Sequence, residues 1–146
     1  MLNLGCTYLI VKDMDKSIAF YEELLEMKVS VRRYDRWAQF DFGKTIALLN
    51  PDYDRRQIAQ GSDLGAHYSS GYLAYLDERQ IKYGNNIVLN LNTDDLNAEY
   101  LRIRDRRIGK TTEIMYLNIS SPYYLFLVED PDGNTVEITG DYLQEN

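Results

Sequence analysis

Residues 6–14 read Cys-Thr-Tyr-Leu-Ile-Val-Lys-Asp-Met, and residues 88–96 read Val-Leu-Asn-Leu-Asn-Thr-Asp-Asp-Leu, at a constant offset of 82. Each stretch starts as a β-rich run and reaches an aspartate that can cap a following helix. In each stretch the next residue, Met14 or Leu96, is apolar and starts the helical pattern. An internal repeat of this kind indicates two copies of one structural unit in the chain.

The same order of elements follows each copy. Apolar periodicity and turn residues predict a helix over 14–27 and strands over 28–33, 37–42 and 45–49. In the second copy they predict a strand over 87–92, a helix from 96 to about 109, and strands over 111–118, 123–129 and 135–139. The tight turn at 130–134 joins the last two strands. Both halves therefore have the order β-α-β-β-β.

The segment between the two copies is less regular. A helical turn is expected at 54–60, residues 61–71 have the Gly and Ser content of a loop, and 72–76 is either a short helix or an edge strand. We expect an α+β fold over 1–146, one domain of two βαβββ modules. The first module covers about 2–50, the linker about 51–85 and the second module about 86–142. Each mostly antiparallel sheet is expected to curl around a shared cup.

Composition limits the partners. Sixteen Lys and Arg against 23 Asp and Glu give a net charge of −7, which disfavours nucleic acid and anionic membranes as partners. No apolar run approaches the ~18 residues of a spanning helix, and the N-terminal stretch does not resemble a signal peptide. The single Cys6 precludes an internal disulfide and suits the cytoplasm, where we expect the protein.

Three stretches resemble the vicinal oxygen chelate superfamily, which includes glyoxalase I, bleomycin-resistance proteins and extradiol dioxygenases. Val11-Lys-Asp-Met-Asp-Lys-Ser-Ile-Ala-Phe-Tyr-Glu-Glu-Leu-Leu25 resembles its first strand and helix. Leu91-Asn-Thr-Asp-Asp-Leu-Asn-Ala-Glu-Tyr100 resembles the strand-to-helix junction of the second module. Phe126-Leu-Val-Glu-Asp-Pro-Asp-Gly-Asn-Thr-Val-Glu-Ile138 resembles the closing hairpin. The resemblance implies the fold and leaves the activity open, because this fold serves several chemistries.

In the metal-using members, four cup-facing positions supply His and Glu ligands. The resemblance places the first, third and fourth of these positions at Cys6, Val88 and Glu137, and the second near residues 47–49, with Leu48 as the best register. Residues 44–50 contain no Asp, Glu, His or Cys, so a small register error does not restore the second ligand. Since a catalytic divalent ion normally needs about three protein ligands, we predict no metal and no cofactor.

Alternation along the strands predicts which side chains line the cup. If the helices cover Leu9, Val11, Leu89, Leu91, Val136 and Ile138, the inward set includes Cys6, Ile10, Val88, Thr135 and Thr139. From that face and from the strand at 37–42 we predict the ligand-binding residues Tyr8, Trp37, Gln39, Asp41, Asn90, Asn92 and Glu137. For the strand at 123–129, either the Tyr124, Phe126, Val128 face or the Tyr123, Leu125, Leu127 face can point inward.

Several of these residues have a plain structural alternative. Glu137 is either a hydrogen-bonded structural acid or, in function, a general base or an anchor for a cation. Trp37 is either a core plug or a stacking platform. Cys6 is expected to be a small buried residue, and His67 an exposed loop residue. The cluster Arg102, Arg104, Arg106 and Arg107 is expected to be a solvated helix face.

Two function classes follow. The first is a metal-independent small-molecule-binding protein of the glyoxalase/bleomycin-resistance type that sequesters a cationic or aromatic compound. The alternative is a glyoxalase-type lyase or isomerase (lactoylglutathione lyase-like), or a dioxygenase-related enzyme, in which Glu137 acts as the catalytic base. A ligand sensor is a third, weaker hypothesis. The resemblance also implies a homodimer.

Overall fold

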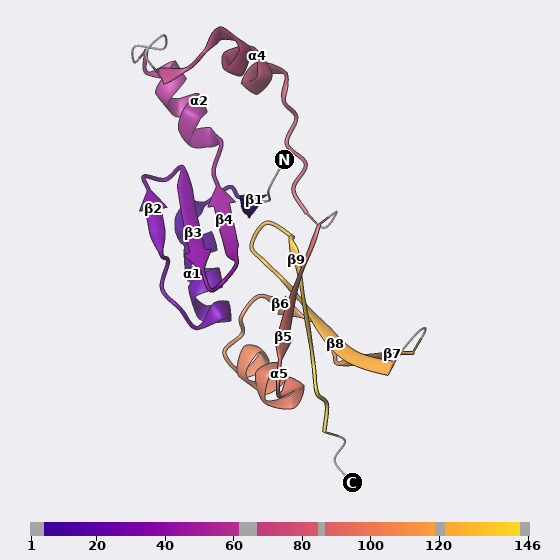
Figure 1. Ribbon diagram of the computed structural model, residues 1–146. Coiled ribbons are helices and arrows are strands. Elements are labelled where there is room, and N and C mark those ends of the chain that lie inside the picture. The colour runs from indigo at the N-terminus through magenta and orange to yellow at the C-terminus, as the bar shows by residue number, and fades with distance from the viewer. Residues whose placement is uncertain (1–4, 62–66, 85–86, 119–121, 144–146) are drawn as a thin grey trace. The chain divides into compact units, whose positions relative to one another are not determined.

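The structure is a computed structural model of the chain, described over residues 5–61, 67–84, 87–118 and 122–143 (Figure 1). The chain forms two compact units: Met1–Ile18 with Lys28–Tyr83, and Ala19–Met27 with Gly84–Asn146. The boundary runs through helix α1 (Met14–Leu25), whose later residues belong to the second unit. Each unit contains one mixed sheet that is mostly antiparallel, as the α+β prediction requires.

The sheet of the first unit has the strand order β1-β4-β3-β2, in which only β1 and β4 are parallel. Its strands are β1 (Thr7–Ile10), β2 (Val31–Arg33), β3 (Trp37–Asp41) and β4 (Thr45–Leu49). Helices α2 (Asp52–Ala59) and α4 (Ser70–Glu78) follow β4 along the chain. The region 72–76, for which helix and edge strand were both open, is therefore helical. Its N-cap Ser69 accepts a hydrogen bond from the backbone N–H of Tyr72.

The two faces of this sheet differ in burial. Leu48 pairs in register with Leu9 on one side and Ala38 on the other, and all three side chains are buried. Ala47 pairs with Tyr8 and Gln39, so these residues share the opposite face because side chains alternate along a strand. We call this the Tyr8 face. Alternation thus predicted the two faces of β1 and β3 correctly.

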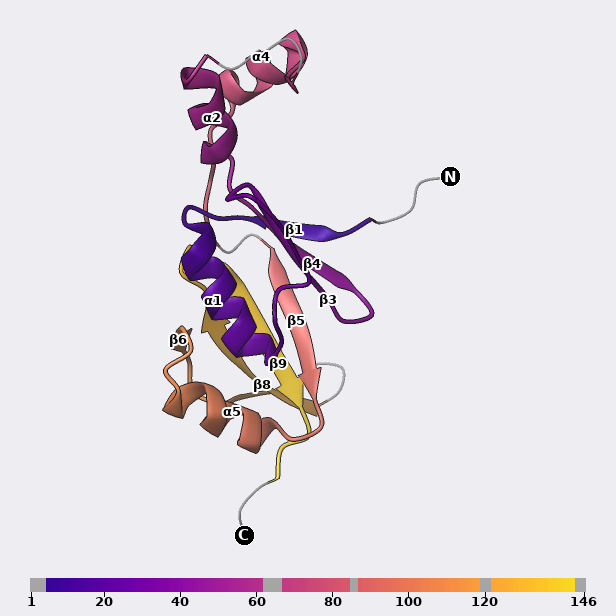
Figure 2. The ribbon, with the colours of Figure 1, turned by 90° about the vertical axis from the view of Figure 1, so that its left-hand side faces the viewer.

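The sheet of the second unit has the order β5-β9-β8-β6, with β7 also paired to β8. Its elements are β5 (Val88–Thr93), α5 (Leu96–Asp105), β6 (Lys110–Thr111), β7 (Met115–Asn118), β8 (Pro122–Glu129) and β9 (Thr135–Gly140). Figure 2 shows α5 alongside β8 and β9, onto which it packs. The single strand predicted over 111–118 is wrong, because it is split into β6 and β7. The Thr112 hydroxyl takes the place of a backbone acceptor there and receives the N–H of Leu127 at 3.0 Å.

The repeat predicted from the sequence is confirmed at the helix starts. Met14 and Leu96 are both first helical residues, 82 positions apart. The predicted strand over 28–33 is wrong at its start, since β2 begins at Val31. The predicted helix ends are also too late: α1 ends at Leu25, where Glu26 takes a φ of 50°, and α5 ends at Asp105. Positive φ values favour helix termination.

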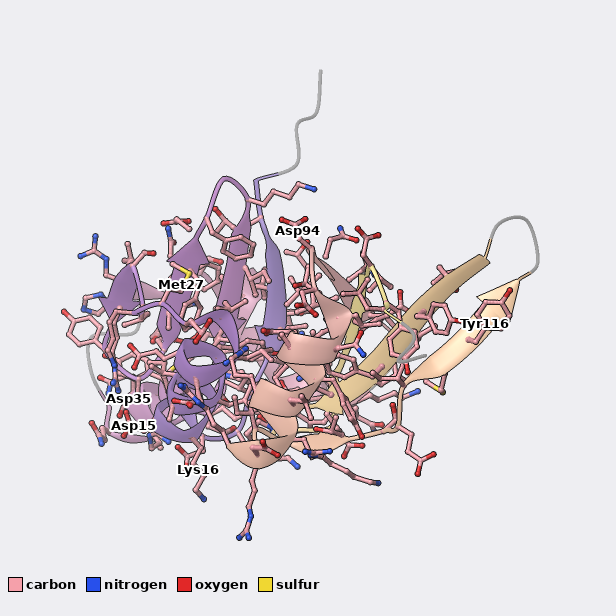
Figure 3. All side chains as sticks on the ribbon, turned by 90° about the horizontal axis from the view of Figure 1, so that it is seen from below. Asp15, Lys16, Met27, Asp35, Asp94 and Tyr116 are labelled. Atoms are coloured by element: carbon pink, nitrogen blue, oxygen red, sulfur yellow. The ribbon has the colours of Figure 1, made fainter. Side chains whose placement is uncertain are left out.

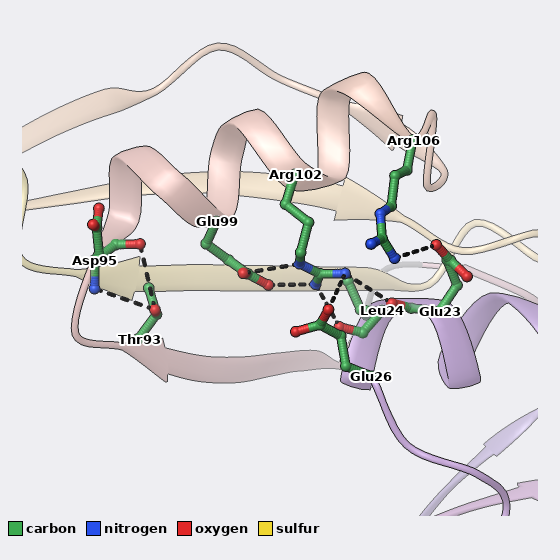
Figure 4. Close-up of polar contacts among 8 residues, drawn as sticks. All are labelled: Glu23, Leu24, Glu26, Thr93, Asp95, Glu99, Arg102 and Arg106. Carbon is green, nitrogen blue, oxygen red and sulfur yellow. Dashed lines mark hydrogen bonds and ion pairs between the residues drawn. The ribbon is translucent and has the colours of Figure 1, made fainter.

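Arg102 of α5 closes the end of α1 within the second unit (Figure 4). Its guanidinium donates to the carbonyl oxygens of Glu23 at 2.9 Å and Leu24 at 2.7 Å, which lie in the last turn of α1. Glu99 holds the same guanidinium from within α5, and this hydrogen bond raises the pKa of Arg102. The prediction of a solvated Arg cluster is therefore wrong for Arg102, whose side chain is only 14% exposed.

Arg32 forms two surface ion pairs in the first unit. One of its terminal nitrogens lies 2.8 Å from Asp15 and 2.6 Å from Asp35, two carboxylates that are neighbours in Figure 3. All three side chains are substantially exposed, so these pairs contribute little to stability. No helix in the described part of the chain is long and apolar enough to cross a membrane.

Asp130 organises the turn between β8 and β9. Its buried carboxylate accepts hydrogen bonds from the backbone N–H groups of Asp132 (2.9 Å) and Asn134 (2.8 Å) and from the Asn134 amide (2.8 Å). It also accepts the Tyr21 hydroxyl of α1 at 3.0 Å. Burial, followed by the charge of Asp130, raises the pKa of Tyr21, so this hydroxyl remains a donor.

We predict that Asp130→Ala lowers the free energy of unfolding by roughly 3–5 kcal/mol, because several buried donors lose their acceptor. Tyr21→Phe, which removes one hydroxyl, is expected to cost about 1 kcal/mol. Urea denaturation of both variants and of the exposed control Asp94→Ala, for which a change within about 0.5 kcal/mol is expected, measures the difference. An Asp130→Ala cost as small as that of the control would contradict this account of the turn.

Candidate functional site

The Tyr8 face of the first sheet carries an aromatic pair and a line of polar groups. The rings of Tyr8 and Trp37 lie 5.6 Å apart, centroid to centroid, with an interplanar angle of 58°. Along β3, the Trp37 indole N–H donates to Gln39 at 3.1 Å, and the Gln39 amide donates to Asp41 at 2.9 Å. Thr45 of β4 donates to the other Asp41 oxygen at 2.7 Å. The four first-unit residues predicted to bind ligand thus lie together on one face.

Asp41 is a well-defined anion at the end of this line. The hydrogen bonds from Gln39 and then from Thr45 lower its pKa, because they stabilise the charged carboxylate. The side chain is exposed, whereas Trp37 is half-buried and Tyr8 is 47% exposed. The face therefore offers solvent an aromatic surface at one end of β3 and a negative charge at the other.

The second sheet carries a polar cluster on the face of Glu137. The Asn90 amide donates to Glu137 at 2.7 Å, and the Thr139 hydroxyl donates to Asn92 at 2.8 Å. The register pairs Leu127 with Glu137 and Phe126 with Ile138. The choice left open for the strand at 123–129 is thereby decided: Tyr123, Leu125 and Leu127 share the Glu137 face. Phe126 and Val128 are fully buried on the other face.

One of the four positions assigned to metal ligands needs correction. Asn90 pairs with Glu137, and Tyr8, its counterpart 82 residues earlier, pairs with Ala47. Ala47 is therefore the first-module equivalent of Glu137, and Leu48 is the equivalent of the buried Ile138. The assignment to Leu48 is wrong by one residue, which moves a side chain to the other face of a strand. Ala47 offers a methyl group and no metal ligand.

The donor set does not fit a catalytic metal. Within residues 5–61, 67–84, 87–118 and 122–143, no group of three or more His, Cys, Asp or Glu side chains is placed to hold a metal ion. Of the four family positions, only Glu137 and Cys6 carry donor atoms. Val88 is an exposed apolar residue, and the Glu137 carboxylate already accepts the Asn90 amide. No mechanistic step through a metal follows from these residues.

A third cluster lies at α2 and α4, where no site was predicted from the sequence. Asp54 of α2 is 1% exposed and accepts hydrogen bonds from Arg36 Nε at 2.8 Å, Tyr72 at 2.8 Å and Tyr68 at 3.1 Å. Burial opposes the charge of Asp54, but the hydrogen bonds, first that of Arg36 and then that of Tyr72, outweigh it and lower its pKa. Burial, followed by interactions with Asp54, raises the pKa of both tyrosines.

Little in the sequence predicts this cluster. Tyr68 and Tyr72 are four residues apart, which puts both on one side of a helical turn. The high Tyr content of the chain is the other signal, with 13 Tyr against 4 Phe. Neither indicates the partner, because Asp54 and Arg36 come from distant segments that only the fold brings together. His67, predicted to be exposed, is exposed at the edge of this cluster.

The comparisons with known proteins identify the family. The model of the Glyoxalase/Bleomycin resistance protein/Dioxygenase superfamily matches residues 3–138, and the chain belongs to this superfamily. No curated protein matches the sequence.

Solved structures share the fold at low sequence identity. A lactoylglutathione lyase from Agrobacterium tumefaciens is 18% identical, with a TM-score of 0.63 over 94% of this chain and 92% of its own. A glyoxalase/bleomycin resistance protein/dioxygenase family enzyme from Burkholderia phytofirmans PsJN is 19% identical, with a TM-score of 0.63 over 95% and 98%. A virulence protein from Salmonella typhimurium is 20% identical, with a TM-score of 0.60 over 98% of both chains. Such identities establish the fold alone.

We predict that divalent metals do not stabilise the folded chain. A ligand that binds only the native state raises the melting temperature with concentration, whereas this donor set offers no site of useful affinity. Thermal melts with ZnCl₂, NiCl₂ or MnCl₂ are expected to stay within about 1 °C of a chelator-treated sample. A rise that saturates at one equivalent of metal would overturn the donor count.

We predict a specific pH dependence for Asp54→Asn. The pKa of Asp54 is lowered on folding, so its charge stabilises the native state above pH 3.8, its ordinary value, and this contribution is lost as pH falls through the lowered pKa. At pH 7 the variant is expected to lose roughly 1–3 kcal/mol, less than a fully buried pair because Arg36 is partly exposed.

The difference in the free energy of unfolding between wild type and Asp54→Asn should become smaller when urea denaturation is repeated from pH 7 down to pH 3. The matched control is Asp52→Asn, in the same helix, whose carboxylate forms an exposed pair with Arg55. We expect that change to cost about 0.5 kcal/mol or less. A gap for Asp54→Asn that is independent of pH would show that its charge is not what stabilises α2.

Proposed function

We propose that this protein is a metal-independent small-molecule-binding protein, and that the Tyr8 face binds an elongated aromatic cation. The observation that carries the proposal is the alignment on β3 of an aromatic platform, Trp37 with Tyr8, and an ordered carboxylate, Asp41. Aromatic rings stack on indole and phenol faces, and a cation pairs with the charged carboxylate.

The spacing along the strand sets the shape of the ligand. A strand rises ~3.3 Å per residue, so Trp37 and Asp41, four residues apart, are separated by about 13 Å. Gln39 lies between them with its amide engaged on both sides. A ligand with its ring system and its positive charge at opposite ends suits this face better than a compact one. The net charge of −7 favours the approach of a cation at low salt.

The Glu137 face supports a similar role in the second unit. Asn90 and Asn92 offer amide groups, and Glu137 offers one carboxylate, beside the apolar Leu127. We treat Glu137 as an anchor for a cation. The alternative, a glyoxalase-type lyase with Glu137 as base, is less favoured because Ala47 and Val88 supply no partner donor for its chemistry. We also propose a homodimer in the cytoplasm, on the grounds of family habit and the single cysteine.

The experiment uses dansylcadaverine, a naphthalene sulfonamide with an ammonium group on a flexible tether. Trp37 is the only tryptophan, so its emission reports binding at the Tyr8 face directly. Dansylcadaverine is expected to quench Trp37 and to bind roughly two- to fivefold tighter than its uncharged N-acetyl derivative, the range of an exposed ion pair. Dansyl-aminohexanoate, which carries a negative charge instead, is expected to bind most weakly.

Asp41→Asn should remove the preference for the cation while leaving binding of the N-acetyl derivative unchanged. Asp35→Asn, which neutralises another exposed carboxylate of the same unit, is the matched control. The lyase alternative is tested in parallel, by S-lactoylglutathione formation with wild type and Glu137→Gln. Turnover that Glu137→Gln abolishes would favour the enzyme. Equal affinity for all three dansyl compounds, with unchanged Trp37 emission, would refute binding at the Tyr8 face.

A further inference from the structure

A pocket of about 640 Å³ opens between the turn at 34–36, helix α2 and the start of α4, within the first unit. This volume lies inside the ~300–1,000 Å³ range of small-molecule sites. The side chains that matter for its chemistry are Tyr34, Arg36, Tyr53, Asp54, Tyr68 and Tyr72. The pocket is separate from the Tyr8 face described above, and none of the predicted ligand-binding residues lines it.

Asp54 fixes the positions of the polar side chains around the pocket. Both of its oxygens accept hydrogen bonds, one from Arg36 and Tyr68 and the other from Tyr72. With 1% of its side chain exposed, it presents no free carboxylate to a guest. Its role is to position the groups around it, because a buried charge holds its donors in one arrangement.

Arg36 presents unused donors to the pocket. Its Nε is taken by Asp54 at 2.8 Å. Among the described residues, its terminal nitrogens reach only the Tyr72 hydroxyl, at the long distance of 3.5 Å. The side chain is 38% exposed and lines the pocket. A guanidinium fixed at Nε, with its outer edge accessible, is suited to a two-pronged hydrogen bond with a carboxylate.

The walls are two stacked tyrosine pairs. Tyr34 and Tyr53 lie 5.7 Å apart with an interplanar angle of 14°, and Tyr68 and Tyr72 lie 5.9 Å apart with an angle of 6°. The hydroxyls of the second pair are held by Asp54, which fixes the orientation of those rings. Tyr34 is 74% exposed, so one wall is open to an incoming ring. Near-parallel rings of this kind favour a flat guest.

We propose that this pocket is a second binding site and that it takes a planar aromatic carboxylate. The carboxylate binds the outer edge of Arg36, and the ring packs against the tyrosine faces. Asp54 is a positioning residue that holds Arg36 and the two tyrosine hydroxyls. A cation is disfavoured, because Asp54, the one carboxylate among the described lining residues, is buried and already accepts three hydrogen bonds, whereas the accessible charge is that of Arg36.

The test uses 2-naphthoate and its neutral isostere 2-naphthamide with the full chain, by calorimetry and ligand-observed NMR. Naphthoate is expected to bind roughly fivefold or more tighter than naphthamide, as a charge-assisted pair at a half-buried site should give. Tyr34→Ala, at a mostly exposed position, is expected to weaken both compounds alike. Tyr75→Ala, in α4 but outside the pocket lining, is the matched control and should change neither affinity.

The arginine is tested by a paired replacement. Arg36→Leu alone would leave Asp54 buried without its cation and is expected to unfold α2. The double variant Arg36→Leu/Asp54→Leu removes both charges together, and it should fold and bind naphthoate no better than naphthamide. Equal affinity of the two compounds in wild type, a naphthoate preference that survives the double variant, or affinities that Tyr34→Ala leaves unchanged would each overturn the proposal.

The two sites are distinguished by their variants. Asp41→Asn should affect dansylcadaverine and leave naphthoate unchanged, and Tyr34→Ala should do the reverse. If the Tyr8 face fails to bind dansylcadaverine, the naphthoate experiment still tests the pocket independently. Displacement of naphthoate by dansylcadaverine would show a single shared site and would overturn the assignment of two.

Discussion

The carboxylate of Asp130 lies in the turn between β8 and β9, where it is buried and accepts four hydrogen bonds, one of them from the Tyr21 hydroxyl of α1. A buried charge is tolerated only when its acceptor sites are filled. The need to fill the acceptor sites of Asp130 fixes the path of the Asp-Pro-Asp-Gly-Asn turn. This turn then sets the register of β8 on β9. Because a shift of one residue would move every side chain to the other face, Asp130 determines which face Glu137 occupies.

The first unit also contains a buried carboxylate that accepts hydrogen bonds from tyrosine hydroxyls. Asp54 is buried like Asp130, and tyrosine hydroxyls supply donors to both carboxylates. The tyrosine content of the chain therefore has a physical use beyond filling the core. Tyr21 is buried and Tyr68 and Tyr72 are partly buried, and each donates a hydrogen bond to an acid, which phenylalanine cannot do. In the first unit this pairing links α2 to Tyr72 of α4 and to Tyr68, which comes just before α4.

Family membership rests on the fold, whereas the function proposed here rests on individual side chains. The superfamily model matches residues 3–138, and the 82-residue repeat together with the strand registers of this chain relates Asn90 and Glu137 to Tyr8 and Ala47. At two of the positions that the resemblance assigns to metal ligands, Ala47 and Val88 carry no donor atoms in their side chains. The chemistry available on the two sheets is aromatic stacking, amide hydrogen bonding and carboxylate charge. This inventory is the basis of the small-molecule-binding role proposed above.

The sequence by itself determined the repeat, the order of elements in the first module, the helix starts at Met14 and Leu96, and the faces of β1, β3 and β5. These are set by the alternation of side chains along a strand and by capping residues, which are local. The tertiary structure decided the register of β4, where the run Ile46–Leu49 is apolar throughout and alternation carries no signal. It also decided the helical state of α4, the capping role of Arg102 and the cluster at Asp54. Each of these depends on partners far apart in the sequence, and pairing over such distances leaves no local pattern to read.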